Sequence, residues 1–273
     1  MFENQVLNEI LAVAPVFLLI AVRALAMIET APLLNSESVP QVAKIALAGF
    51  AAYSSLSSTL VRNWVLAPIG VSFIFLIVGE AIIGIIIGFF MALIFSAFST
   101  AGQFFSLQMG FGASETFDPL SQIENPLLGQ YLNIVAMLVF VTIDGFRELF
   151  LGGFWRSLQS INVMSLINGR ENVVSMVMAG LSRLFLDAII ISMPILGTLF
   201  LVSLSTGLIS KAAPQINILS EGFPISITVA FLLIFAAMPF MVEAFSRVIG
   251  SSFQTLQTLY IQIGQRITAG GAL

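Results

Sequence analysis

The chain has 273 residues, of which 58% are hydrophobic and only 9% are charged, and its mean hydropathy is +1.05. Soluble domains contain about 25% charged residues, so this composition predicts an integral membrane protein with a single membrane domain. The chain has no cysteine and no histidine, and its net charge is −4 with Lys44 and Lys211 as the only lysines. These features exclude disulfides, thiolate metal sites and histidine-based catalysis, and they argue against an enzyme, a cofactor site and a nucleic-acid partner.

Six apolar runs follow one another along the chain, most of them at or above the ~20 residues that a membrane-spanning helix needs. They cover residues 10–28, 42–61, 71–100, 127–150, 173–204 and 223–250. The third and fifth runs are too long for one perpendicular crossing, so tilting, kinking or extension beyond the bilayer is expected. Pro194 and Pro239 are the expected kink positions, because each removes a backbone hydrogen bond. The sequence therefore predicts an all-α membrane protein with long, bent helices and helical hairpins.

The third run carries a ridge of small residues, one at every fourth position. The ridge consists of Gly84, Gly88, Ala92, Ser96 and Thr100. Such a groove lets the backbone of a neighbouring helix approach closely. Two interpretations remain open, namely packing against another helix of the same chain and an interface with another subunit.

The stretch that follows, residues 102–126, differs from ordinary connecting loops of membrane proteins. It contains no lysine or arginine, and its bulky apolar side chains are Phe104, Phe105, Met109, Phe111 and Phe117. Glycine gives the backbone conformational freedom at no steric cost, and Phe111 lies between Gly110 and Gly112. Apolar side chains on such a backbone are suited to blocking or sealing a passage.

Several charged residues lie inside the apolar runs, where an unpaired charge costs several kcal/mol. Arg183 and Asp187 are spaced i,i+4, and so are Glu243 and Arg247, so each pair can meet on one helix face. We interpret both as intramembrane charge pairs with a structural role. Asp144 is followed by glycine and predicts a helix end.

Glu80 has no partner on its own run, and three interpretations remain open. It can pair with Arg23 or with a cation of a neighbouring subunit, act in a proton relay, or face water in a pore. We expect the pairing role, which places Glu80 at a helix-packing or subunit interface. No two carboxylates share a run at helical spacing, so general acid–base chemistry has no support in the sequence.

The C-terminal stretch carries an apolar seam on an otherwise polar helix. Its members alternate spacings of three and four: Phe253, Leu256, Tyr260, Ile263 and Ile267. The seam is expected to pack either on this chain or on a partner.

Three stretches together carry a resemblance to a known family. The first has Ala31-Pro32, Val39-Pro40 and Lys44; the second runs from Ala101 through Gln108-Met109-Gly110-Phe111-Gly112 to Asp118-Pro119; the third runs from Gly207 through Ala213-Pro214 to Gly222-Phe223-Pro224. In this order and spacing they closely resemble the FliR family of flagellar biosynthesis proteins, which is related to the SctT-like export-apparatus proteins of virulence-type secretion systems. The third stretch is more similar to the flagellar branch.

The resemblance implies a subunit of the flagellar type III export gate in the bacterial inner membrane, at the flagellar basal body. The implied partners are FliP and FliQ, with which the chain would form a protein-conducting channel, as well as FlhB, exported unfolded flagellar proteins and membrane lipid. The implied architecture is a FliP-like part, residues 1–170, followed by a FliQ-like helical hairpin with a C-terminal amphipathic extension, residues 171–273.

The resemblance also implies that the loop of residues 103–125 is a pore plug. Met109, Phe111 and Phe117 would obstruct the pore, Gly110 and Gly112 would let the loop move, and Asp118-Pro119 would end it. An apolar constriction excludes water and ions by dewetting, and methionine adapts its shape to varied polypeptides. Two other functions remain open from the residues, a multi-pass secondary transporter and a purely structural assembly scaffold.

Overall fold

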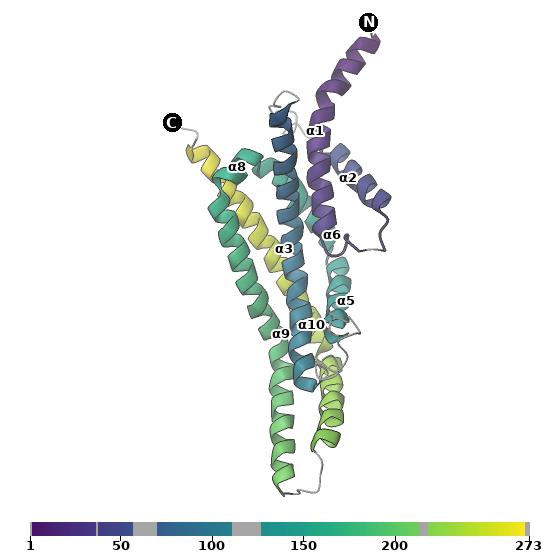
Figure 1. Cartoon of the computed structure of the whole chain (residues 1–273), viewed down its shortest axis with the longest axis vertical. Coiled ribbons are helices and arrows are strands. Elements are labelled where there is room, and N and C mark those ends of the chain that lie inside the picture. Colours follow the sequence, from purple (N-terminus) through teal and green to yellow (C-terminus); the bar gives the residue numbers. More distant parts are fainter. Residues whose placement is uncertain (1, 37, 57–69, 111–126, 213–217, 271–273) are drawn as a thin grey trace. The chain divides into compact units, whose positions relative to one another are not determined.

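The computed structural model describes residues 2–36, 38–56, 70–110, 127–212 and 218–270 (Figure 1). Among these residues every regular element is a helix, which confirms the predicted all-α class. The elements are α1 (Phe2–Thr30), α2 (Gln41–Leu56), α3 (Val71–Met109), α5 (Leu127–Thr142), α6 (Gly145–Arg147), the π-helix η2 (Glu148–Trp155), α7 (Arg156–Ser160), α8 (Val163–Asn168), α9 (Arg170–Ala212) and α10 (Ile218–Gly270).

Within the described ranges, four helical segments are long and apolar enough to cross a membrane: Val13–Thr30 of α1, α3, α9 and Pro224–Ile261 of α10. At 1.5 Å per residue, α3 and α9 are about 58 and 64 Å long, well beyond a hydrocarbon core of ~30 Å. α2 and α5 have 16 residues each and are shorter than a typical span. The end of the predicted run 42–61 lies outside the described residues.

The predicted run 127–150 is not one helix, because it is interrupted at Asp144. α5 ends at Thr142, and Asp144 adopts a left-handed backbone with φ 57°. This conformation is tolerated by aspartate better than by most residues and stops a right-handed helix. The helix end predicted at Asp144 is therefore confirmed, and the chain continues through α6 into η2.

The chain forms two compact units that are each assembled from separate stretches. Unit 1 contains Met1–Leu93, Asp144–Gly180 and Ser251–Leu273, and unit 2 contains Ile94–Ile143 and Leu181–Gly250. Several helices therefore contribute residues to both units. The division into a FliP-like part, residues 1–170, and a FliQ-like hairpin, residues 171–273, is a separate matter and stays a prediction.

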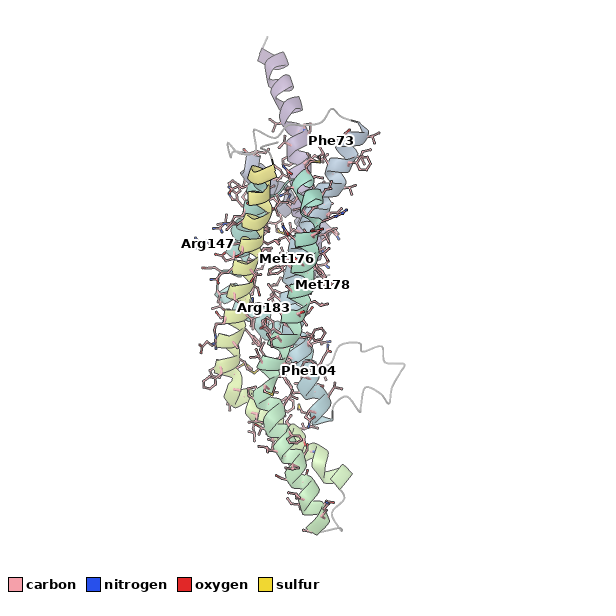
Figure 2. The ribbon with its side chains drawn as sticks, turned by 90° about the vertical axis from the view of Figure 1, so that its left-hand side faces the viewer. Phe73, Phe104, Arg147, Met176, Met178 and Arg183 are labelled. Carbon is pink, nitrogen blue, oxygen red and sulfur yellow. The ribbon has the colours of Figure 1, made fainter. Side chains whose placement is uncertain are left out.

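Unit 1 has its core around α1. Ile20, Ala24 and Met27 of α1 are fully buried, and α2 packs against this helix. On the unit 1 portion of α9, Met176 is buried, whereas Met178 is exposed (Figure 2).

Unit 2 has an aromatic core. The ring of Phe95 lies 5.6 Å from that of Phe140, and the ring of Phe98 lies 4.3 Å from that of Phe245, measured between centroids. α3 and α5 approach closely at Gly102, where an added Cβ would lie 2.6 Å from the Gly129 backbone.

Candidate functional site

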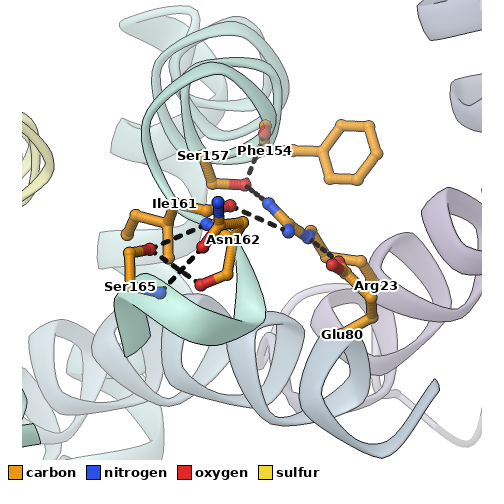
Figure 3. Close-up of polar contacts among 7 residues, drawn as sticks. All are labelled: Arg23, Glu80, Phe154, Ser157, Ile161, Asn162 and Ser165. Atoms are coloured by element: carbon orange, nitrogen blue, oxygen red, sulfur yellow. Dashed lines mark hydrogen bonds and ion pairs between the residues drawn. The ribbon is translucent and has the colours of Figure 1, made fainter. Parts of the chain in front are cut away.

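The most deeply buried charged group in unit 1 is the ion pair between Arg23 of α1 and Glu80 of α3 (Figure 3). Arg23 Nε donates to Glu80 Oε2 at 2.5 Å, and the two side chains are 0% and 3% exposed. Of the three interpretations of Glu80, the structure therefore shows the pair with Arg23. Two charges inside an apolar chain are tolerated because each compensates the other.

Arg23 also connects α1 to α7 and to Ile161, the residue that follows α7. Its two terminal nitrogens donate to Ser157 Oγ at 3.0 Å and to the carbonyl oxygen of Ile161 at 3.1 Å, while the Ser157 hydroxyl donates to the Phe154 carbonyl at 2.6 Å. One guanidinium thus reaches two other segments of the chain (Figure 3). The arrangement joins α1, α3 and α7 through one buried side chain.

The end of this network is fixed by a capping box at the start of α8. Asn162 Oδ1 accepts from the Ser165 backbone N–H at 2.7 Å, and the Asn162 backbone N–H donates to Ser165 Oγ at 2.8 Å. These reciprocal bonds fix where α8 begins. They therefore hold the neighbouring Ile161 carbonyl in place for Arg23.

The first two members of the small-residue ridge lie against α1. An added Cβ at Gly84 would collide with the Arg23 carbonyl oxygen, and one at Gly88 would meet the Met27 carbonyl oxygen at 2.7 Å. Glycine at these positions lets α3 reach α1 closely enough for Arg23 to meet Glu80. For Gly84 and Gly88 the structure therefore shows packing against another helix of the same chain, which is one of the two interpretations of the ridge.

The later members of the ridge have less contact with the chain itself. Ala92 and Thr100 are half-buried and Ser96 is exposed. An interface of these residues with another subunit stays a prediction.

The two i,i+4 charge pairs lie in unit 2, and the charged atoms of each pair are farther apart than in a direct hydrogen bond. Arg183 Nε lies 3.7 Å from Asp187 Oδ2, and Arg247 Nη2 lies 3.7 Å from Glu243 Oε1. Arg183 is about half-exposed on α9 (Figure 2), and Glu243 and Arg247 are largely exposed on α10.

The predicted plug loop starts later than residue 103, because residues 103–109 are the last two turns of α3. Their apolar side chains continue the helical pattern, and the glycine at 102 is retained inside the helix because α5 packs directly on it. Met109 is fully buried within the chain, and Gly110 has φ 88°, which ends the helix. The other predicted plug residues, namely Phe111, Gly112, Phe117, Asp118 and Pro119, lie outside the described residues.

The first part of the C-terminal seam packs within the chain. Phe253, Leu256 and Tyr260 are buried, and the Tyr260 hydroxyl donates to the Gly153 carbonyl of η2 at 3.0 Å. Packing on this chain, one of the two interpretations, is thus observed for these three residues. The side chains of the seam beyond residue 261 lie outside the described part.

Sequence reasoning missed several of these contacts. The spacing of Asn162 and Ser165 is a capping signal that a scan for helix starts would find. Lys44 is buried, and its Nζ lies 3.1 Å from Glu29 Oε2. In the sequence, only the position of Lys44 inside an apolar run indicated that it needs a partner. Nothing in the sequence indicates that Ser157 accepts from Arg23, because that contact joins residues 134 positions apart.

The helices and buried polar groups of the described residues define a class of protein. It is an all-helical membrane protein whose buried polar groups stabilise helix packing, and the described residues contain no cluster of carboxylates, histidines or cysteines that would hold a metal.

Comparison with known proteins identifies the family. Residues 14–252 match the bacterial export proteins, family 1. The chain is 28% identical over 260 residues to the flagellar biosynthetic protein FliR of Bacillus subtilis, covering 94% of this chain and 99% of the relative. It is 31% identical over 246 residues to FliR of Escherichia coli, with 88% and 91% covered. A shorter match, 28% over 165 residues, joins it to the surface presentation of antigens protein SpaR of Shigella sonnei, with 59% and 61% covered.

The chain therefore belongs to this bacterial export family and is a FliR-family flagellar biosynthesis protein. It is a membrane component of a flagellar, type III export apparatus and not an enzyme. The resemblance read from the three sequence stretches is confirmed at the level of the family.

Proposed function

We propose that the chain is a subunit of the flagellar type III export gate, which forms with FliP and FliQ the protein-conducting channel for unfolded flagellar proteins. It lies in the inner membrane at the basal body and contacts FlhB. The single observation that carries this proposal is the family match over residues 14–252. The large apolar surface of the chain supports it, since only 22% of the most apolar window of α10 and 28% of that of α9 are buried inside the chain.

The proposed plug is the apolar segment after α3. Since α3 continues to Met109, the plug begins at Gly110 and contains Phe111 and Phe117, and Asp118-Pro119 ends it. The buried Met109 anchors the start of this segment instead of obstructing the pore. Gly110, with its positive φ, is the position where the chain leaves the helix.

Two experiments test this function separately. Affinity purification of the tagged chain from membranes is expected to recover FliP- and FliQ-like chains, and their absence from an otherwise intact preparation would overturn the gate assignment. Deletion of residues 110–116 is expected to make the membrane leaky to protons and ions while the complex still assembles. An unchanged leak in an assembled complex would refute the plug and favour a purely structural scaffold.

No observation favours the secondary transporter. The two carboxylates on which ion coupling would depend, Glu80 and Asp187, lie in ion pairs with Arg23 and Arg183. Replacement of Glu80 by glutamine with loss of small-solute uptake and unchanged export would favour the transporter.

A further inference from the structure

The π-helix η2 ends at a backbone amide that is shared between two acceptors. The Arg156 N–H donates to the carbonyls of Leu151 and Gly153, which lie five and three residues back along the chain. An α-helix would use the carbonyl four residues back, which belongs to Gly152. A π-helix is uncommon, and short π segments within helices frequently lie at functional sites. η2 therefore holds a residue that an α-helix of the same length would have to place elsewhere.

The π form of η2 depends on a contact from another helix. Gly152 and Gly153 weaken an α-helix locally, because glycine is among the poorest helix formers, but they do not select the π form. The Tyr260 hydroxyl of α10 donates to the Gly153 carbonyl at 3.0 Å, the same carbonyl that accepts from Arg156. Tyr260 is 3% exposed, so water does not compete for this bond. The position of α10 at Tyr260 therefore bears directly on the form of η2.

The two ends of η2 are held differently. After its C-terminal end, the Ser157 hydroxyl and the Ile161 carbonyl accept from the buried Arg23 and are fixed by it. Before its N-terminal end, α6 begins directly after Asp144, whose backbone is left-handed, and α5 has already ended at Thr142. A residue released from η2 can therefore be taken up at Asp144 without breaking a continuous helix.

We propose that η2 is a register switch that the Tyr260 hydroxyl holds in its π form. When Tyr260 withdraws from Gly153, η2 becomes α-helical and its extra residue passes to the Asp144 end. Residues 145–151 then each move to the place of the preceding residue, a shift of about 1.5 Å along the helix axis and about 100° around it. The switch is a property of this chain, so it is tested without any partner.

Single cysteines can report this shift, because the chain has no cysteine of its own. Leu149 is 1% exposed and Leu151 is 53% exposed. In the α form Leu149 takes the exposed place of Glu148, and Leu151 takes the half-buried place of Phe150. The measurement is the rate at which N-ethylmaleimide modifies Leu149→Cys or Leu151→Cys in the detergent-solubilised full chain.

Tyr260→Phe removes the hydroxyl and keeps the ring. Loss of one such hydrogen bond changes an equilibrium by about 2- to 12-fold. We therefore expect Leu149→Cys to react faster by about this factor in the Tyr260→Phe background, while the reaction of Leu151→Cys does not become faster. Tyr131→Phe, which removes a hydroxyl at a 43% exposed position of α5, is the matched control and should change neither rate.

Deletion of Gly152 provides a second test, because it removes the extra residue itself. Residues 145–151 then keep their places while η2 becomes α-helical, so Leu149→Cys should react as slowly as in the parent. Adding Tyr260→Phe to the deletion should no longer change that rate. Circular dichroism shows whether the deleted chain folds, and if it does not, the Tyr260→Phe measurement alone decides.

Three results would overturn the switch. The first is an unchanged Leu149→Cys rate in Tyr260→Phe. The second is a rise in both rates, which indicates local unfolding instead of a change of register. The third is an effect of Tyr260→Phe that persists after deletion of Gly152, because no residue is then left to shift. Failure of the parent chain to recover FliP and FliQ would refute the proposed function and leave the switch standing.

Discussion

Replacement of Glu80 by glutamine tests whether the Arg23–Glu80 pair stabilises unit 1. The side chains are nearly identical in shape, so the change removes the negative charge while keeping the packing. Arg23 then remains charged and fully buried, and the Ser157 hydroxyl, the Ile161 carbonyl and the amide oxygen of the new glutamine are neutral acceptors that carry no counter-charge. Removing one partner of a buried ion pair costs about 3–5 kcal/mol, because it leaves a buried charge uncompensated.

The measurement is the free energy of unfolding of the purified chain in detergent, followed by circular dichroism as a denaturing detergent is added. The double variant Arg23→Met/Glu80→Met removes both charges and replaces them with flexible apolar side chains. It is expected to be more stable than Glu80→Gln, because well-packed apolar replacements of a buried pair are often neutral. Part of the gain is offset, since the Ile161 carbonyl loses its donor at a cost of about 1–3 kcal/mol.

The control is Glu243→Gln, which removes a carboxylate from a largely exposed i,i+4 pair. Exposed pairs of this kind contribute about 0.3–0.5 kcal/mol, so the isolated chain should hardly change. The reasoning is refuted if Glu80→Gln unfolds at the parent's detergent concentration, or if the double variant loses as much stability as the single one.

Three further predictions use the same unfolding measurement. Gly88→Ala should destabilise the chain by about 1–3 kcal/mol, because its Cβ has no space against α1, whereas Gly197→Ala at an open position should stabilise it by up to about 1 kcal/mol; equal effects would contradict the packing account. Glu29→Gln should cost more than Lys44→Met, since the first leaves a buried ammonium without its counter-charge while the second leaves a carboxylate that is one-third exposed; the reverse order would contradict this. Tyr260→Phe should cost about 0.5–1.5 kcal/mol by removing the hydroxyl that donates to the π-helix, and an unchanged stability would show that this bond is replaced.

The apolar runs predict the helices well, because the sequence alone determines where a helix can be stable in lipid. The membrane class, the all-α fold and the helix end at Asp144 all follow from such local patterns. The i,i+4 spacing of Arg183 and Asp187 likewise predicts that the two residues meet, since helix geometry places them on one face.

Features that depend on tertiary packing were not predictable in the same way. α3 continues through Gly102 because α5 lies against that glycine, and a glycine followed by phenylalanines reads equally well as the start of a loop. The π-helix of residues 148–155 has no clear local signature; the Tyr260 hydroxyl that donates to its Gly153 carbonyl comes from α10, more than a hundred residues away.

The ion pairs of the chain lie in two different environments, and this difference determines how much each pair stabilises the chain. Arg23 is fully buried with its carboxylate, a hydroxyl and a carbonyl, so its contacts are complete before any partner is present. Glu243 and Arg247 are instead 70% and 75% exposed and lie 3.7 Å apart. Loss of the Arg23 pair should therefore destabilise the isolated chain, whereas reversal of the Glu243–Arg247 pair, which keeps both charges at i,i+4 spacing, should leave its stability nearly unchanged.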